Sequence, residues 1–351
     1  MKKICFSVGP SELYPGVEGY IKDALSEEVS SISHRGEEFS ALFKSVTKNL
    51  KKLLGIPKDY EIFFLSSGTE AMERVIQNLV EKTSLHFING AFSKRFYQTA
   101  KELGKEPLKI EEIPGRNFDF KKIDIPKEVE VICFTQNETS TGTVLTMEDV
   151  YQLKKRHPQK LIAVDVVSSA PFVSINYKFT DCVFFSVQKG FGLPAGLGVL
   201  VVSPAGLKKA KALEEKGISL GSYHSFLVLK KFADKHQTPE TPNIFLLYLL
   251  DKVVSDMLKK GIEKIRKETK VKAKLLYNFF GECSFVKNPK DRSKTIVVMA
   301  SEKAKELQER LNKKGFVVSG GYGEFKDKHL RIGNFPAHST SDVKKLIKAF
   351  S

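Results

Sequence analysis

Three groups of residues in this sequence could do chemistry together, and each follows a run of apolar residues. Lys189 comes directly after TDCVFFSVQ and precedes the glycine-rich stretch GFGLPAGLG. Asp165 lies inside the apolar run KLIAVDVV, where a carboxylate needs a cation or a hydrogen-bond donor. The turn SSGTE (66–70) opens a helical pattern, and the N–H groups of a helix N-terminus favour an anion. Together they suit a ligand that carries an aldehyde, a protonatable ring nitrogen and a phosphate.

The elements that must position these residues alternate along the chain. Between residues 60 and 202, short apolar runs alternate with helical patterns, which predicts strands and helices in turn. We expect strands over 61–67, 84–90, 129–138, 160–169, 180–187 and 197–203, and helices over 69–82, 93–104 and 146–158. Near-continuous apolar strands indicate an α/β fold with a mostly parallel sheet sandwiched by helices. Ligands of such sheets bind beyond the carboxyl ends of the strands, so the polar residues there should cluster.

The pattern changes beyond residue 245. A helical stretch over 244–280 is followed by short strands over 294–300, 315–321 and 329–335 and by a final helix. This order predicts a smaller α+β domain packed with the N-terminal segment. We therefore divide the chain into a large domain, 16–245, and a small domain made of 1–15 and 246–351.

Composition bounds the class of protein. The chain has 351 residues and a net charge of +16, but its lysines are spread along helical stretches, and no nucleic-acid motif accompanies them. It contains no apolar run of eighteen residues and no apolar signal segment. Its four cysteines are widely spaced, which favours neither disulfides nor zinc. We expect a cytoplasmic protein that binds no nucleic acid, membrane or metal.

Pyridoxal phosphate is a ligand that would match Lys189, Asp165 and the turn at 66–70. Its aldehyde needs a lysine, its ring nitrogen an acidic partner and its phosphate an anion site. Each element also has a simpler interpretation: the turn at 66–70 as an ordinary helix cap, and the polar stretch NETSTG (137–142) as a turn. The combination at successive strand ends is what favours the cofactor.

Eight motifs carry a resemblance to a known family over nearly the whole chain. In order they are GPSELYP, ISHRGEEF, SSGTEAMERVIQN, NGAFSKRF, NETSTG, VDVVSS, SVQKGFGLPAGLGV and RIGNFPAHS. The sequence resembles the class V (fold-type I) pyridoxal-phosphate-dependent aminotransferases, and within them most of all the phosphoserine aminotransferase branch. Each motif alone is weak, whereas the ordered set is specific.

The resemblance implies a role for each matching residue. Lys189 would form the Schiff base with the cofactor, and Asp165 would pair with its ring nitrogen. The other cofactor contacts would be Phe92 stacked on the ring, Thr139 near its 3-oxygen, Gly68, Thr69 and Gln188 at the phosphate, and Thr241 reaching in from the partner subunit of a homodimer. The substrate would be held by Arg331 at its α-carboxylate and by His34 and Arg35 near its distal anion. Outside the resemblance, Phe92 could equally be a core residue and His34 a helix cap.

The resemblance further implies the amino transfer from O-phosphoserine to 2-oxoglutarate, with small amino acids and 2-oxo acids as the partners of the site.

Two departures from the family pattern leave other functions open. Lys326, Lys328 and His329 stand where phosphoserine enzymes carry a second His-Arg pair, and Glu240 replaces an asparagine. A serine/alanine–glyoxylate type aminotransferase is the first alternative, and a non-catalytic basic binding protein is the remote one. A cysteine desulfurase is disfavoured, because Phe92 replaces the stacking histidine and only Cys283 could supply the thiol.

Overall fold

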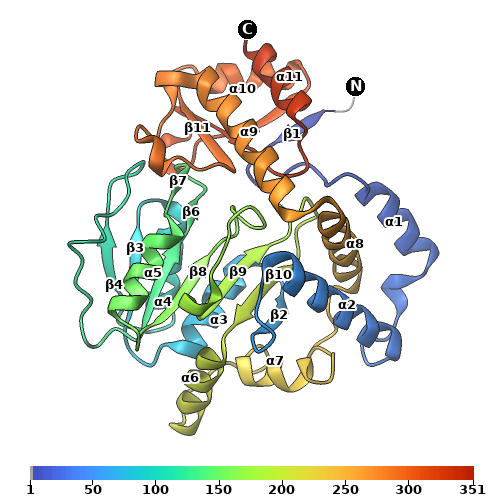
Figure 1. Ribbon diagram of the computed structural model, residues 1–351, viewed down its shortest axis with the longest axis vertical. Coiled ribbons are helices and arrows are strands. Elements are labelled where there is room, and N and C mark those ends of the chain that lie inside the picture. The colour runs from blue at the N-terminus through green and yellow to red at the C-terminus, as the bar shows by residue number, and fades with distance from the viewer. Residues whose placement is uncertain (1–2) are drawn as a thin grey trace.

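The computed structural model describes residues 3–351 and contains two main β-sheets (Figure 1). The larger sheet has seven strands in the order β2-β10-β9-β8-β5-β3-β4. Their bounds are β2 Glu61–Leu65, β3 Ser84–Ile88, β4 Leu108–Glu111, β5 Val131–Thr135, β8 Leu161–Asp165, β9 Cys182–Ser186 and β10 Gly198–Val202. A two-stranded ribbon, β6 Asn137–Glu138 with β7 Thr143–Val144, follows β5.

All strands of the larger sheet except β10 run in one direction. β3, β4, β5, β8 and β9 pair in parallel, whereas β10 is antiparallel to both β9 and β2. The carboxyl ends of β2, β9, β8, β5 and β3 therefore meet at one edge. The α/β fold and the mostly parallel sheet agree with the sequence, although β4 was not expected.

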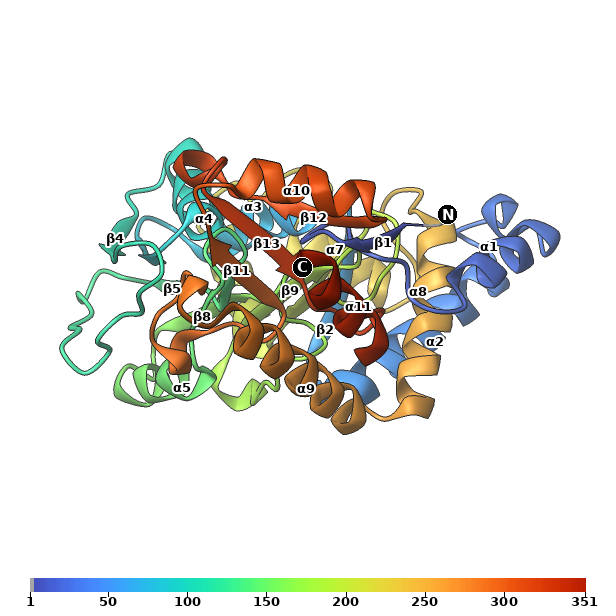
Figure 2. The same ribbon diagram turned by 90° about the horizontal axis from the view of Figure 1, so that it is seen from above.

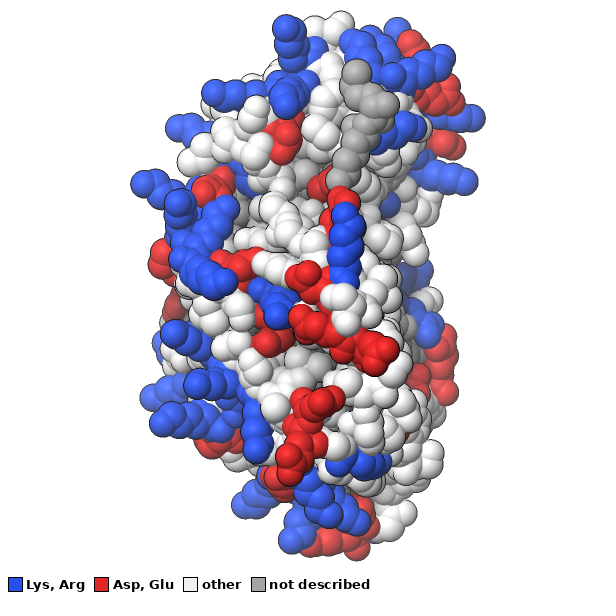
Figure 3. All heavy atoms as spheres, turned by 90° about the vertical axis from the view of Figure 1, so that its right-hand side faces the viewer, with Lys and Arg blue, Asp and Glu red and all other residues white. Residues whose placement is uncertain are grey.

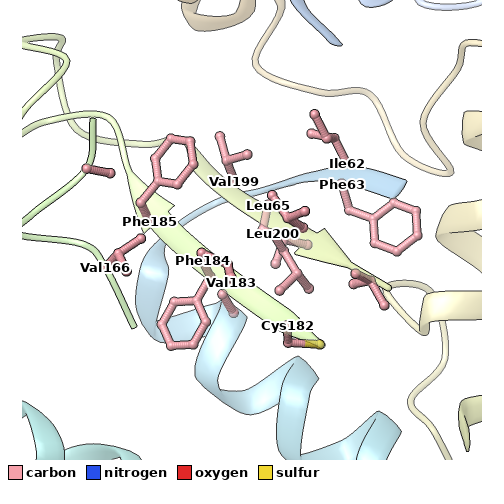
Figure 4. Packing of buried hydrophobic residues seen from close by; sticks show 14 of the residues in the cluster. Ile62, Phe63, Leu65, Val166, Cys182, Val183, Phe184, Phe185, Val199 and Leu200 are labelled. Atoms are coloured by element: carbon pink, nitrogen blue, oxygen red, sulfur yellow. The ribbon is translucent and has the colours of Figure 1, made fainter. Parts of the chain in front are cut away.

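The core explains why these strands are apolar on both faces. Side chains of β2, β9 and β10 pack against one another and against neighbouring helices, with Phe184 and Leu200 wholly buried (Figure 4). The helices of this part of the chain are α1 Val17–Ser26, α2 Glu37–Leu54, α3 Gly68–Leu79, α4 Ala91–Glu102, α5 Met147–Arg156, α6 Pro204–Glu215 and α7 Phe226–Ala233. Since helices cover both faces, the strands need no polar side.

The smaller sheet is built from both ends of the chain. Its order is β1-β12-β13-β11, with β1 Ile4–Phe6, β11 Ile296–Ala300, β12 Phe316–Gly320 and β13 His329–Gly333. Seen from above, these strands lie side by side with α9 Ile262–Phe280, α10 Ala304–Lys313 and α11 Thr340–Phe350 around them (Figure 2). β1 pairs in parallel with β12, which ties the N-terminal segment to this sheet.

The helical stretch 244–280, expected as one helix, is two. α8 Ile244–Lys260 ends at Gly261, whose φ of 85° lies in the region that favours glycine, and α9 begins directly after it. α8 packs against α2, and its buried residues belong to the core of the larger sheet. The proposed domain boundary at 245/246 remains a prediction, and this packing favours a boundary nearer to α9.

Charge is spread over the surface of the molecule. On the face shown in Figure 3, lysines and arginines lie mostly toward the edges, and acidic side chains gather across the middle. The net charge of +16 therefore forms no uninterrupted basic patch on this face. Among residues 3–351, no helix is long and apolar enough to cross a membrane, and no group of histidine, cysteine and acidic residues is arranged to hold a metal ion.

Candidate active site

A cavity of about 270 Å³ lies at the edge where the carboxyl ends of the parallel strands meet. It is lined by eight of the eleven residues that the sequence singled out: Gly68, Thr69, Phe92, Thr139, Asp165, Gln188, Lys189 and Arg331. These residues come from six separate segments, between residue 68 and residue 331. The expected clustering at the strand ends is therefore confirmed, while the role of each residue stays a prediction.

Lys189 lies three residues beyond β9 and is 6% exposed. Its Nζ donates to Thr139 Oγ1 at 3.0 Å and lies 5.1 Å from the centre of the Phe92 ring. Burial lowers the pKa of this amine, and the charge of Asp165 opposes that shift. A lowered pKa is what a lysine needs to act as a base or a nucleophile near neutral pH.

The stem of Lys189 fits because its neighbour across the cavity has no side chain. A Cβ on Gly9 would stand 2.7 Å from Lys189 Cε, and the φ of Gly9 is 140°. Sequence reasoning quoted GPSELYP as a motif but assigned Gly9 no role. The available signal was the glycine that precedes a proline in this motif, although the motif lies far from Lys189 in the sequence.

Asp165 is the last residue of β8 and is 4% exposed. Its Oδ1 accepts a hydrogen bond from the backbone N–H of Val167 at 2.8 Å. Burial raises the pKa of this carboxyl above its usual value, while the Val167 N–H and the charge of Lys189 act in the opposite direction. A cation placed beside Asp165 would restore its charged form, which is the property required of a partner for a ring nitrogen.

The start of α3 forms an anion cradle beside these two residues. Ser67 caps the helix, its Oγ accepting from Glu70 N at 3.0 Å, and Gly68 N donates to Ser186 Oγ at 2.7 Å. A Cβ on Gly68 would stand 2.7 Å from Val167 Cγ2. The helix N-terminus and its small residues leave room for a phosphate close to the backbone.

Behind the cradle, two carboxylates hold one histidine. Glu70 Oε1 bonds His224 Nδ1, and Glu240 Oε2 lies 2.9 Å from His224 Nε2. Although burial lowers the pKa of His224, the bonds to Glu240 and Glu70 outweigh it and raise the pKa to about 9. Burial likewise opposes the shift at Glu70, yet the bonds to His224 and Ser66 bring its pKa down to about 2. Glu240 thus ties the segment before Thr241 to the cradle.

Arg331 enters the cavity from the smaller sheet. It lies on β13, is 8% exposed, and donates from Nε to Gly320 O at 2.7 Å and from Nη1 to Thr139 O at 3.3 Å. Its guanidinium also lies 5.6 Å from the centre of the Tyr322 ring. Because its remaining N–H groups have no carboxylate partner within residues 3–351, the fork is suited to a carboxylate that enters the cavity.

Glu138 positions Phe92, and sequence reasoning gave it no role. Its buried carboxylate accepts hydrogen bonds from Phe92 N at 3.2 Å, from Ser93 N and Oγ at 2.9 Å, and from Ser140 N at 3.1 Å and Oγ at 2.6 Å. It therefore satisfies the free N–H groups at the start of α4. An acid in NETSTG was the available signal, since a carboxylate at a buried strand exit needs several donors.

The other three predicted site residues lie outside this cavity. Arg35 and Thr241 are exposed and His34 is half-buried. Arg35 donates from Nη1 to Thr238 O at 2.6 Å and from Nη2 to Pro239 O at 3.1 Å, next to Thr241 in the chain. The structure thus brings the segments 33–36 and 237–241 together, apart from Lys189.

The three residues that stand in place of the second His-Arg pair do not line the cavity either. Lys326 and Lys328 are exposed, and His329 is buried, its ring stacked on Phe325 with centroids 4.4 Å apart. Burial and the charge of Arg331 lower the pKa of His329 to about 4. His329 is therefore a neutral packing residue near Arg331, and it adds no charge to the cavity.

The residues present fit pyridoxal phosphate. The cavity holds a buried amine, a buried acid, an aromatic wall and a helix N-terminus, all within one space. This fold and this set of groups define an aminotransferase of fold-type I. The sequence profile of the family "Aminotransferase class-V" matches residues 7–324, and the chain belongs to this family.

Proteins similar to this chain are named as aminotransferases. A phosphoserine aminotransferase of Cytophaga hutchinsonii, known as a crystal structure, is 43% identical, covers 99% of this chain and 98% of its own, and superposes with a TM-score of 0.97. A phosphoserine aminotransferase of Rhodococcus opacus is 28% identical over 98% of this chain and 93% of its own. An alanine–glyoxylate aminotransferase of Nostoc sp. shares the fold at 22% identity, covering 100% of this chain and 94% of its own, with a TM-score of 0.82. The protein is a transaminase.

Proposed function

We propose that this transaminase uses pyridoxal phosphate to exchange the amino group of O-phosphoserine with 2-oxoglutarate. The choice of substrate rests on the similarity to the Cytophaga hutchinsonii phosphoserine aminotransferase, at 43% identity over almost the whole of both chains. The cavity supports the reaction class, since it combines Lys189, Asp165 and Arg331.

Different residues of this chain would bind the cofactor, bind the substrate and transfer the proton. Pyridoxal phosphate, when bound, supplies an aldehyde for the amino group and a ring that accepts electrons. Asp165 holds the ring nitrogen in its protonated state, and the start of α3 with Gln188 binds the phosphate. Arg331 binds the α-carboxylate of the substrate and so orients its α-carbon. Lys189 Nζ would move the proton from that carbon to the carbon that had carried the cofactor aldehyde, as a general acid/base, and would move a proton the opposite way in the second half-reaction.

The distal anion of the substrate is proposed to meet a second subunit. Within one chain the cavity offers no cation besides Lys189 and Arg331 among the described residues. His34, Arg35 and Thr241 share one surface of the same chain. In a homodimer this surface would face the partner's cavity and complete it. Light scattering on the purified protein tests the dimer, and a monomer that retains full activity would contradict it.

We also propose a cytoplasmic location. All four cysteines are free, and Cys133 and Cys182 are completely buried, which suits a reducing compartment. Cell fractionation followed by immunoblotting checks this proposal.

A serine/alanine–glyoxylate activity is the second candidate. It is favoured by the absence of Lys326, Lys328 and His329 from the cavity, since a substrate without phosphate needs no extra cation there. The deciding experiment mixes the holoenzyme with O-phosphoserine, serine or alanine and follows the cofactor absorbance. We expect a kcat/KM at least about 100-fold higher for O-phosphoserine, because a charged, bidentate anion contact contributes several kcal/mol.

A higher kcat/KM for serine or alanine would replace the first proposal by the second. A protein that binds no pyridoxal phosphate and turns over none of the three would instead be a binding protein on this scaffold.

A further inference from the structure

A second cleft, which we call the junction cleft, lies where α9 meets the larger sheet. Its volume is about 430 Å³, and the residues that matter here are Gln136, Asn137, Lys270, Lys290, Arg292 and Lys294. The start of α5 forms another part of its wall, and Figure 2 shows α5 and α9 on the same side of the molecule. Gln136 and Asn137 line this cleft, whereas Thr139, two residues further along, lines the active cavity, and the two share no lining residue.

The cations of the junction cleft are poorly compensated. Arg266, on its wall, donates to Phe172 O at 3.0 Å and to Val173 O at 3.2 Å, and it pairs with Glu263, the one acid that lines the cleft among the described residues. The ammonium groups of three lysines form no hydrogen bond or ion pair within residues 3–351; these are Lys270, Lys290 and Lys294.

Lys294 is the lysine whose charged form is disfavoured by its surroundings in this cleft. Its pKa is lowered by burial first, and then by the charges of Arg292 and Lys270. Like charges gathered around a half-buried group destabilise one another unless an anion lies between them. Lys44 and Lys48 of α2 differ from these lysines, because they lie on the exposed face of one helix.

The floor of the cleft adds an independent observation. Gln136 and Asn137 are 4% and 3% exposed, and Gln136 Oε1 and Asn137 Oδ1 have no hydrogen-bond partner among the residues that the structure describes. Their amide nitrogens already donate hydrogen bonds, from Gln136 Nε2 to Leu145 O at 2.8 Å and from Asn137 Nδ2 to Ser168 Oγ at 2.8 Å. Two buried acceptors without a donor can each accept a hydrogen bond from a hydroxyl or ammonium group that enters the cleft.

We propose that the junction cleft binds a small phosphomonoester that also carries a hydroxyl or ammonium group. The phosphate dianion would lie among Lys270, Lys290 and Lys294. The donor group would reach the side-chain oxygens of Gln136 and Asn137. Inorganic phosphate shares only the first of these two interactions, so the two ligands can be told apart.

Calorimetric titration of the holoenzyme with glycerol 3-phosphate and, separately, with inorganic phosphate tests this site. We expect glycerol 3-phosphate to bind at least tenfold more tightly than inorganic phosphate. The double variant Lys270→Ala/Lys294→Ala should weaken its binding at least tenfold. The matched control Lys44→Ala/Lys48→Ala, which removes the same charge from α2, should change the Kd by less than twofold.

Lysine acetylation mapped by mass spectrometry locates the ligand without use of activity. Glycerol 3-phosphate should protect Lys270, Lys290 and Lys294 in the holoenzyme and leave Lys44 and Lys48 unprotected. The same protection should occur in the His34→Ala holoenzyme, which separates this site from the distal-anion site of the proposed function.

Three outcomes would overturn the proposal. Equal protection of all lysines would mean that the anion is held only by general charge. Unchanged affinity in Lys270→Ala/Lys294→Ala would place the ligand elsewhere. Equal affinity for inorganic phosphate would remove the role assigned to Gln136 and Asn137.

Discussion

The active cavity and the junction cleft both border the segment 136–139, and their charges are arranged in opposite ways. In the active cavity, the charge of Lys189 is opposed by Asp165, and Glu138 accepts hydrogen bonds from five donors. In the junction cleft, Lys294 lies near other cations and forms no ion pair with an acidic side chain of residues 3–351. The active cavity thus pairs its cation with acidic groups, as a catalytic site needs, whereas the cations of the junction cleft are suited to bind an anion.

Both sites reduce the stability of the folded chain. Burial lowers the pKa of Lys189 and of Lys294, so the charged form of each amine is less favourable in the folded protein than in the unfolded chain. Groups with such perturbed pKa values gather at functional sites more often than elsewhere. The comparison teaches that the acid beside the amine distinguishes a catalytic pocket from an anion site.

The largest expected effect is loss of activity when the amine of the active cavity is removed. Lys189→Ala should lower kcat by at least about 10⁴-fold, because it removes both the anchor of the cofactor and the proton carrier. Rates of keto-acid formation from the amino donor measure this effect. Lys44→Ala, on the exposed face of α2, is the matched control and should keep its activity. A Lys189→Ala protein that still transaminates would remove the distinction between the two sites.

The next effect concerns the carboxylate fork. Arg331→Lys keeps the charge but loses the planar pair of donors, which is worth about 1.5–3 kcal/mol for a hydrogen bond to a charged group. We expect KM to rise about 10- to 100-fold for the amino acid and for the 2-oxo acid. Steady-state kinetics with both substrates check this, and Arg310→Lys on α10 serves as control. An unchanged KM would mean that another group binds the α-carboxylate.

The segment that lies between the two sites can be tested through Glu138. Glu138→Gln keeps the shape but replaces one acceptor oxygen by an NH₂ group that meets N–H and O–H donors. We expect a loss of about 3 kcal/mol in the free energy of unfolding, because buried donors lose a charged partner. Urea denaturation measures it. A loss below about 0.5 kcal/mol would show that these donors do not depend on the charge of Glu138 and that Phe92 is positioned by other contacts.

The network behind the cradle predicts a pH dependence. Because the pKa of His224 is raised to about 9, its bonds to Glu70 and Glu240 stabilise the fold fully below pH 6.5, and this stability is lost as pH rises through 9. Because the pKa of Glu70 is lowered to about 2, the same bonds are also lost as pH falls from 4.5 toward 2.

The measurement compares unfolding of the wild type and His224→Gln across pH. We expect a difference of about 2 kcal/mol near pH 6 that shrinks by pH 9.5. A difference that does not vary with pH would contradict a charged histidine.

The smallest effect is expected in the junction cleft and has the opposite sign. Lys294→Met should stabilise the free protein by about 0.5 kcal/mol at pH 7, a small gain because solvent screens the half-exposed amine. Since the pKa of Lys294 is lowered, the gain should disappear as pH rises toward 10.5. Thermal unfolding at pH 7 and pH 10 measures it, with Lys313→Met on the surface as control. A loss of stability would show that Lys294 is compensated after all.

Sequence patterns anticipated most of the fold, because strands buried on both faces are recognisable as apolar runs and amphipathic helices by their period. They missed β4, whose residues are only partly buried at the edge of the sheet, and the break at Gly261, where one glycine interrupts a helical pattern. For the site, the polar residues after strand ends were visible, since sheet topology places them at one edge. Glu138 and Gly9 were not assigned, because their roles depend on contacts between distant segments.

By itself, the sequence determined the α/β architecture, the lysine and the acid at neighbouring strand ends, and the membership in the aminotransferases that its ordered motifs carry. Only the tertiary structure decided which of these residues share a space. It placed Lys189, Asp165 and Arg331 in one cavity, put His34 and Thr241 outside it, and turned Lys326 and Lys328 toward solvent. The physical reason is that residue types and local periodicity are encoded along the chain, whereas compensation of charge depends on neighbours that only packing brings together.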